Sequence, residues 1–519
     1  MSDAMDRGIT VTEIAPMDQP IDANTETTAA FVGRALRGPL NTPVLIDNFA
    51  MFRRQFGGTW RHSSLGPAVQ QFFDHGGKKL YIVRVASNAR GATIRLPAAG
   101  GALVLQALAP GSTERIRAAV DYDGIADEEH FNLTVQRIAP ETGLVADQEI
   151  YLRLSCREDS KSSITDSLLN SSLVSVQAPL PTGRPLTTTR PGLPFGASYM
   201  GHAQQGTDGD ELSDYDLVGS VTRSSGIFAL NQVDQFDILY LTPPGKHTDV
   251  GLPAVLAAER YCRKRGALFI MDPPHSWDTV DNTIAGLASS GISGPNVLAY
   301  FPRVVVAGDD DSAPRVAGAA IAGLLCRLDR QHGPWEDLDQ PGFGLDRRLV
   351  PACKVGIDEA QSLVRRGVNI IALTGSGRAM LCGSVTLGYG SQLERSHACL
   401  TTRRLCLSIT NHIERAIRWS VFERNDARVA ERIQAQVHAY LSALADAGAF
   451  ADDRFTVQCE ARLRAGPLDP DRGVAVLLAF RPAGADETVA LTLHQTVTGC
   501  RVAPTAFAPT LGSIIAEVA

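Results

Sequence analysis

The sequence lacks the signals of a membrane protein and of a secreted precursor. No apolar run approaches the roughly 18–20 residues that a membrane-spanning helix requires. Residues 1–10 do not show the basic segment followed by an apolar one that opens a secretory signal peptide. We therefore expect no direct membrane insertion, and a chain that is at first made and kept in a cytoplasm.

An excess of positive charge is also missing. Lys and Arg number 49 against 56 Asp and Glu, and the formal net charge is −7. Proteins that neutralise nucleic-acid phosphates usually carry a basic domain or a basic patch. The charge balance therefore predicts no nucleic-acid partner.

Paired cysteines are absent. The nine cysteines are scattered, odd in number and without a C-x-x-C pair, and no group of Cys and His has the spacing of metal ligands. Most of them stand in apolar company, as in Leu405-Cys406-Leu407. We therefore expect buried free thiols and no metal site.

Catalytic and nucleotide-binding motifs are absent as well. Neither G-x-S-x-G nor H-E-x-x-H occurs. Residues 375–378 lack the glycine spacing of a dinucleotide-binding loop, and residues 244–247 lack the upstream Gly and the Ser or Thr of a phosphate-binding loop. The acidic run at 309–311 lacks the alternating spacing of a calcium loop. The sequence predicts no catalytic residue, no cofactor and no metal.

One loop keeps an enzyme open as the alternative. Asp272 and His275 follow a predicted strand at 268–271, in a region where strands alternate with helices. Strand ends of open α/β sheets are common ligand sites, and an Asp with a His can serve as an acid–base pair. A hydrolase-like α/β enzyme would use this loop. Its two prolines, and the lack of a nearby nucleophile motif, favour a simple turn.

The chain has 519 residues, which is too long for one hydrophobic core. Short alternating segments predict a β-rich insert, and strands alternating with helices predict an α/β layer with a mainly parallel sheet. The predicted fold class is α/β and α+β multidomain. Its C-terminal α+β domain would bear a helix hairpin and exchanged terminal strands. The expected segments are an arm and linker (1–25), the first part of the core (26–88), the β-rich insert (89–196), the α/β domain (197–345), the C-terminal core domain (346–498) and an extension (499–519).

A helix hairpin is predicted between residues 401 and 449. Apolar residues recur at helical spacing on both helices, and Asp426 is well placed to cap the second one. Polar residues fall on the opposite side of the first helix, with an excess of positive charge. The apolar stripes are Leu405, Ile409, Ile413, Ile417 and Val421, then Val429, Ile433, Val437, Tyr440 and Leu444. The polar face is Arg404, Asn411, Arg415 and Arg418.

The segment Thr401–Asp426 resembles the signature helix of contractile tail sheath proteins, with paired basic residues, an apolar stripe and then R-W-x-V-F-E-x-N-D. Residues 27–85 match the same family in the phrases T-A-A-F-V-G-R-A, R-G-P-L-N-x-P-V, F-x-x-x-F-G-G and Y-x-V-R-V. Residues 327–335 match it in R-x-D-x-x-x-G-x-W. Further along the chain, Cys382 stands before a Gly where the family usually has a Trp. The resemblance covers roughly residues 8–85 and 217–497.

This resemblance implies a non-enzymatic structural subunit. It would polymerise as stacked hexameric rings around an inner tube and contract to drive that tube through a target envelope. The implied partners are other copies of the chain, the inner tube protein, and the baseplate and tail terminator proteins. Assembly would take place in the bacterial cytoplasm, and the product would be a bacteriophage tail or a released injection particle. A scaffold that does not contract is a further alternative.

Two terminal strands are predicted to pair between subunits. Residues 8–14 alternate apolar and polar side chains but have no hairpin partner nearby, and a linker with two prolines follows at 16–24. Residues 489–497 form a second alternating strand near the other end. We expect both to add to sheets of neighbouring subunits through main-chain hydrogen bonds. The residues concerned are Ile9, Val11, Glu13, Ile14, Val489, Leu491 and Leu493.

The resemblance also suggests a role for basic residues of the first hairpin helix. In sheaths, a basic inner-facing helix contacts an acidic patch on the tube. The candidates here are Arg403, Arg404, Arg415 and Arg418. By pattern alone, a solvated polar face explains the same residues.

Overall fold

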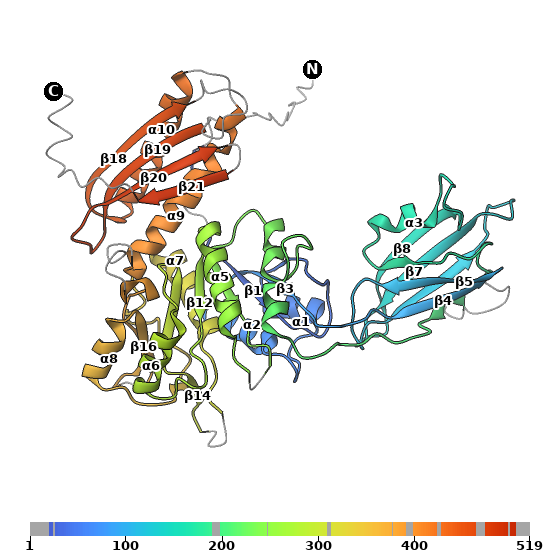
Figure 1. The fold of residues 1–519 in the computed structure, drawn as a ribbon, viewed down its shortest axis with the longest axis horizontal. Coiled ribbons are helices and arrows are strands. Elements are labelled where there is room, and N and C mark those ends of the chain that lie inside the picture. Colours follow the sequence, from blue (N-terminus) through green and yellow to red (C-terminus); the bar gives the residue numbers. More distant parts are fainter. Residues whose placement is uncertain are drawn as a thin grey trace, which may run out of the picture. The chain divides into compact units, whose positions relative to one another are not determined.

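The computed structural model describes residues 20–23, 26–188, 198–245, 248–308, 313–375, 377–390, 398–422, 427–462, 473–496 and 499–504. It is a mixed α/β chain with several sheets (Figure 1). The chain divides into two compact units. The N-terminal unit comprises Thr28–Tyr261 and Gly318–Gly323, and the C-terminal unit comprises Met1–Thr27, Cys262–Ala317 and Leu324–Ala519. Each helix within the described ranges is too short or too polar to cross a bilayer.

A parallel layer forms the core of the N-terminal unit. Strand β1 (Thr28–Gly33) lies between β3 (Lys79–Arg84) and β11 (Ile238–Leu241), and both pairings are parallel. The antiparallel strand β2 (Val44–Ile46) borders β3. Five of the six β1 residues and all four of β11 are buried, as expected of parallel strands covered on both faces.

Short helices cover this layer. Helix α1 (Phe49–Phe56) begins at Asn48, whose side chain accepts a hydrogen bond from the Met51 amide, and ends at Gly57 in the left-handed conformation. Helix α2 (Leu65–Asp74) places Phe72 edge-on against Phe31 of β1, with ring centroids 5.4 Å apart. Helices α4 (Asp214–Val218) and α5 (Leu252–Arg265) also begin in this unit.

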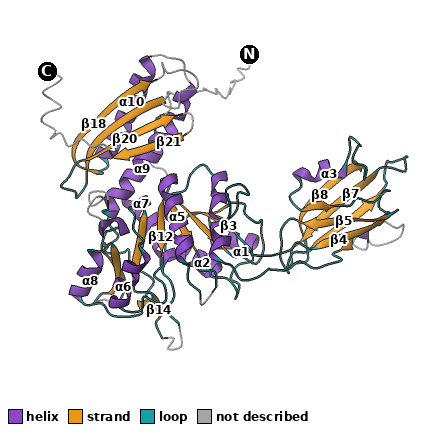
Figure 2. Cartoon of the chain, in the orientation of Figure 1, coloured by secondary structure: helices purple, strands orange, loops and turns teal. Residues whose placement is uncertain are grey.

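Between β3 and α4, the chain forms two antiparallel sheets around one apolar core (Figure 2). The bounds are β4 (Thr93–Ala98), β5 (Gly101–Ala107) and β9 (Val174–Gln177) in one sheet, and β6 (Ile116–Asp121), β7 (Phe131–Ile138), β8 (Val145–Leu154) and β10 (Met200–Gly201) in the other. Helix α3 (Ile164–Ser167) adds Ile164 to the same core. The alternating strands expected in this region are therefore present, and β10 extends the sheet beyond residue 196.

The two connections of this β-rich insert run side by side. Isolated antiparallel bridges join Ser87 to Asp210 and Arg90 to Thr207. Arg84, the last residue of β3, is only 1% exposed and donates to the carbonyls of Gly38 (2.6 Å) and Pro110 (2.7 Å), among others. A buried guanidinium with several acceptors is costly to move, so the insert is held to the parallel layer by polar contacts as well as by the chain.

A second parallel layer belongs to the C-terminal unit. Strands β12 (Leu268–Met271), β13 (Val297–Phe301) and β16 (Val368–Leu373) pair in parallel, and β17 (Ala379–Cys382) closes the edge antiparallel to β16. Because β16 pairs directly with β13, this sheet crosses the boundary predicted after residue 345. The remaining elements around it are α6 (Val280–Ser290), α7 (Gly318–His332), α8 (Ile357–Val364) and the ribbon of β14 (Val304–Val306) with β15 (Leu349–Pro351).

The last part of the chain is an antiparallel sheet with a helix hairpin. Its order is β18-β19-β20-β21, with bounds Phe450–Arg462, Gly473–Pro482, Val489–Thr496 and Gly499–Pro504. Helix α9 spans Leu400–Ile417 and α10 spans Ala427–Asp446. The predicted first helix, which was to stop at residues 425–426, is too long by this measure. Its α-helical part ends at Ile417, and a 3₁₀ turn follows at Arg418–Phe422. Asp426, the expected cap, lies outside the described residues.

Candidate functional site

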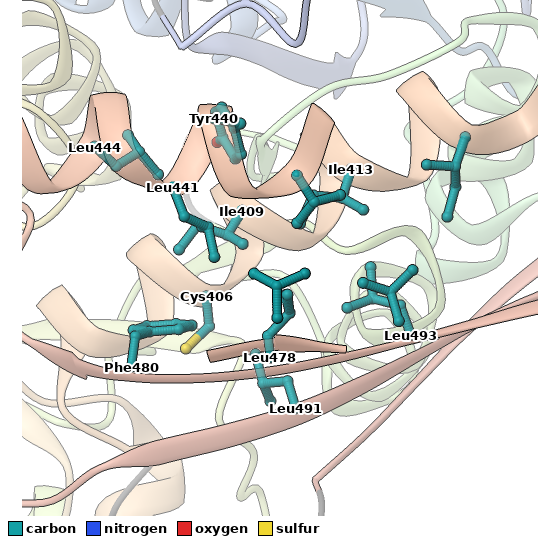
Figure 3. Packing of buried hydrophobic residues seen from close by; sticks show 14 of the residues in the cluster. Cys406, Ile409, Ile413, Tyr440, Leu441, Leu444, Leu478, Phe480, Leu491 and Leu493 are labelled. Atoms are coloured by element: carbon teal, nitrogen blue, oxygen red, sulfur yellow. The ribbon is translucent and has the colours of Figure 1, made fainter. Parts of the chain in front are cut away.

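The apolar stripes of α9 and α10 meet the sheet β18–β21 in one buried cluster (Figure 3). Leu405, Ile409, Ile413 and Ile417 of α9 are all buried, as are Val429, Ile433, Val437, Tyr440 and Leu444 of α10. Side chains such as Leu478, Phe480 and Leu493 complete the cluster from the sheet. The two predicted helices and their apolar stripes are therefore confirmed. Burying a single Leu or Ile contributes about 1.5–3 kcal/mol, so this contact is a major stabilising one.

Strand β20 corrects the expectation of strand exchange at residues 489–497. It pairs with β19 on one side and with β21 on the other, both from its own chain. Val489, Leu491 and Leu493 face the buried cluster. A strand with both edges occupied has no free main-chain groups to offer a neighbour. The predicted exchange therefore does not fit β20. The other strand of the prediction, with Ile9, Val11, Glu13 and Ile14, lies outside the described residues.

Two open edges remain in this sheet. Within the described chain, β18 and β21 each pair on one side only. Their outer main-chain groups form the kind of edge to which an incoming strand can add. Strand β21 (Gly499–Pro504) lies in the segment expected as an extension (499–519), so part of that extension serves as an edge strand.

Arg404 does not lie on an exposed polar face. It is 7% exposed, forms an ion pair with Asp329 of α7 and donates to the carbonyl oxygen of Glu336. Burial lowers the pKa of Arg404 to about 10, which still leaves it charged at neutral pH. The prediction of a solvent-facing Arg404 is wrong because α9 packs against protein on this side too. Asn411, also 7% exposed, donates to the carbonyl of Gly266 at 2.9 Å.

The other candidate arginines are less enclosed. Arg403 Nε donates to Asn296 Oδ1 at 3.1 Å. Arg415 is half-buried and donates to the carbonyl of Asn411 in its own helix at 3.4 Å. Arg418 is exposed and lies 3.4 Å from Glu414, one helical turn earlier. A contact between these arginines and a tube stays a prediction.

Asp329 is the important residue that the sequence motifs alone did not single out. It lies in the stretch R-x-D-x-x-x-G-x-W, where it is the conspicuous acid. In the same stretch Gly333 has φ +98°, and a Cβ there would lie 2.5 Å from Trp335, which packs against the hairpin cluster. The motif thus places an acid and an aromatic ring at the helix hairpin. The packing of the helices shows this placement, and the sequence motif alone does not.

The loop of the enzyme alternative is tied to its surroundings. Arg303, 7% exposed, donates to the carbonyl of Pro273 at 2.8 Å, and its Nη1 lies 3.0 Å from His275 Nε2. A guanidinium at that ring nitrogen occupies the atom that would move a proton or bind a metal. The described residues contain no group of three or more His, Cys, Asp or Glu side chains that could hold a metal ion. The geometry supports a structural turn.

Solved sheath structures share the fold of this chain. A sheath tail protein from Listeria innocua superposes with a TM-score of 0.59, covering 92% of this chain and 96% of its own, at 14% identity. The contracted helical sheath of the anti-feeding prophage gives 0.53, over 93% and 98%, at 13% identity. The chain has the fold of a contractile tail sheath protein.

A third sheath structure shows the same likeness. The contracted sheath complex of PVC, an extracellular contractile injection system, gives a TM-score of 0.50, over 98% of this chain and 96% of its own, at 13% identity. No family model and no curated protein matches the sequence. The resemblance drawn from the helix and N-terminal motifs is confirmed at the level of the sheath fold.

The buried ion pair can be tested by removing one partner. Arg404→Ala leaves the Asp329 carboxylate buried without its cation, so we expect a loss of about 3–5 kcal/mol in the free energy of unfolding. The matched control is Arg418→Ala, which breaks an exposed pair on the same stretch and should cost about 0.5 kcal/mol or less. Denaturant titration measures both. Equal losses in the two variants would contradict the assignment.

A buried histidine predicts acid sensitivity of the hairpin. Nδ1 of His412 in α9 forms a hydrogen bond with the Tyr440 hydroxyl, 2.8 Å away. Burial, and then the charge of Arg415, lower the pKa of His412 to about 4 from its ordinary 6.5, although Asp22 opposes them. The unfolded chain therefore takes up this proton at a higher pH than the folded chain does. The contribution of His412 to the free energy of unfolding should be constant above about pH 6.5 and fall by about 3 kcal/mol as the pH drops to about 4.

The measurement is the free energy of unfolding of wild type and of His412→Phe between pH 4 and 7. The variant has no imidazole to charge, so the difference between the two proteins should change with pH in that window. His438→Gln, at an exposed position of α10, is the control and should follow the wild-type profile. A pH-independent difference for His412→Phe would rule out this source of acid sensitivity.

Proposed function

We propose that this chain is the structural subunit of a contractile tail sheath. In this proposal it polymerises as stacked rings around an inner tube, and the rings rearrange to drive the tube through a target envelope. The observation that carries the proposal is the sheath fold, which extends over more than nine-tenths of both chains in the Listeria comparison. Contraction is then a change between two arrangements of subunit contacts, and its free energy is stored at assembly.

The proposed assembly uses the open edges of the C-terminal sheet. Residues 8–14 of one subunit would add to the edge of β18 or β21 in a neighbour. Each main-chain hydrogen bond contributes only about 1 kcal/mol net, but the contact repeats in every subunit of the polymer. Such lacing would keep subunits connected while their bodies move. The further partners are the inner tube, the baseplate and the tail terminator, and the particle is assembled in the bacterial cytoplasm.

Contact with the inner tube is proposed for the accessible part of the basic helix. Arg403, Arg415 and Arg418 remain candidates, because Arg403 and Arg415 are half-buried and Arg418 is exposed. Arg404 is not available because Asp329 neutralises it inside the unit.

Electron microscopy of the purified chain tests the proposal and its lacing together. We expect wild type to form wide, hollow, striated tubes that shorten on a mild denaturant trigger. A chain lacking residues 1–15 should remain folded and soluble but form no tubes, because its lacing strand is gone. A wild type that never forms tubes would contradict the sheath proposal, and tubes that never shorten would indicate a passive scaffold. Long tubes from the truncated chain would contradict the lacing alone.

The β-rich insert is proposed as an outer decoration that polymerisation does not need. Arg90 and Thr207 exchange two main-chain hydrogen bonds of 3.2 and 2.9 Å, so a short Gly/Ser linker can join them in place of residues 91–206. This excision removes Pro110 and opens the Arg84 side chain to water, which can replace the lost acceptor. The excised chain should unfold cooperatively and still form tubes. A folded excised chain that forms no tubes would show that the insert takes part in assembly.

A further inference from the structure

The chain ahead of β1 rests on the helix hairpin of its own C-terminal unit. Ile21 and Ala23 are partly buried and pack against the cluster formed by α9, α10 and their sheet. Asp22, between them, is exposed, yet its charge acts on both His412 and Tyr440. The described residues 20–23 therefore rest on this cluster, with the Asp22 charge near enough to act on the His412–Tyr440 pair.

A second anchor follows a few residues later. The Thr27 hydroxyl donates to Asp329 Oδ2 at 2.7 Å, and Asp329 is the partner of Arg404. The segment before β1 thus meets the hairpin twice, once through apolar side chains and once through the buried ion pair. Both contacts lie within the C-terminal unit, to which Met1–Thr27 belongs.

We propose that this segment is a releasable strap, which holds the N-terminal linker short while Ile21 and Ala23 are seated on the hairpin. Its apolar anchors are one Ile and one Ala, both only partly buried, so the seat is much weaker than the cluster beneath it. The Asp329–Arg404 pair does not need Thr27, because Arg404 contacts the carboxylate directly. The strap can therefore leave without unfolding the helices.

Release changes the length of the tether. Four freed residues, 20–23, add at most about 14 Å when extended. In the sheath proposed above, on which this step rests, that length is slack available to a moving subunit. A seated strap transmits a pull on the N-terminal arm to α9, whereas a released strap takes up the movement as slack.

The seat is tested first in unpolymerised full-length subunits. Ile21→Asp places a charge in the apolar seat. Ile357→Asp makes the same change at a position 80% exposed on α8 and is the matched control. With the strap released, reaction of His412 with an imidazole-modifying reagent should rise on the order of tenfold, as should amide exchange in α9 and α10. Ile21→Ala and Thr27→Val should give smaller increases. The strap would be overturned if Ile21→Asp reacted and exchanged like Ile357→Asp.

The slack is tested separately in tubes. Ile21→Asp subunits should still assemble, but on a mild denaturant trigger their tubes should shorten less than those of Ile357→Asp. Complete shortening would overturn the slack role even if the seat is real. Failure of wild type to form tubes would overturn the sheath proposal instead, and the subunit measurements would still decide whether the strap exists.

Discussion

Burial of the α9–α10 stripes against the sheet β18–β21 is the constraint on which the C-terminal unit depends. A helix packed on a sheet must place apolar side chains on one face about every 3.6 residues, and a strand must place them at every second residue. The segment from Leu405 to Leu493 meets both requirements. The contact leaves the opposite face of the sheet and its two outer edges for other purposes. It also determines where the chain ahead of β1 can rest.

A polar contact sets the position of α9 against its other neighbour. Asp329 and Arg404 are both largely buried, and a charge left unpaired at such a site is costly. The pair therefore stabilises one placement of α9 on α7 more by penalising the alternatives than by its own net attraction. Asn411 and Arg403 add neutral and charged hydrogen bonds to neighbouring loops. A helix that packs against protein on two sides has little exposed surface left, which limits the residues that the proposed inner tube could contact.

In the proposed sheath, assembly and folding would use different parts of the same sheet. Strand β20 is internal and belongs to the fold, whereas β18 and β21 end the sheet with unpaired main-chain groups among the described residues. Long open edges are hazardous in a monomer and useful in a polymer. In the proposed strap, Ile21 and Ala23 pack only partly against the buried cluster. A segment that is to be released must be bound less tightly than the helices on which it rests.

The sequence by itself determined the amphipathic hairpin, the alternating strands of the insert and the parallel layers, because side-chain period depends only on local backbone geometry. It also supported the sheath fold through motifs that span the chain. Only the tertiary structure decided that Arg404 is paired with Asp329, which lies 75 residues away in the sequence, and that β21 closes the edge of β20. A helical face shows the same polar pattern in the sequence whether water or a buried carboxylate covers it. A strand likewise reads as alternating whether its partner is its own chain or a neighbour. Those choices depend on which elements meet in space, and no local pattern contains that information.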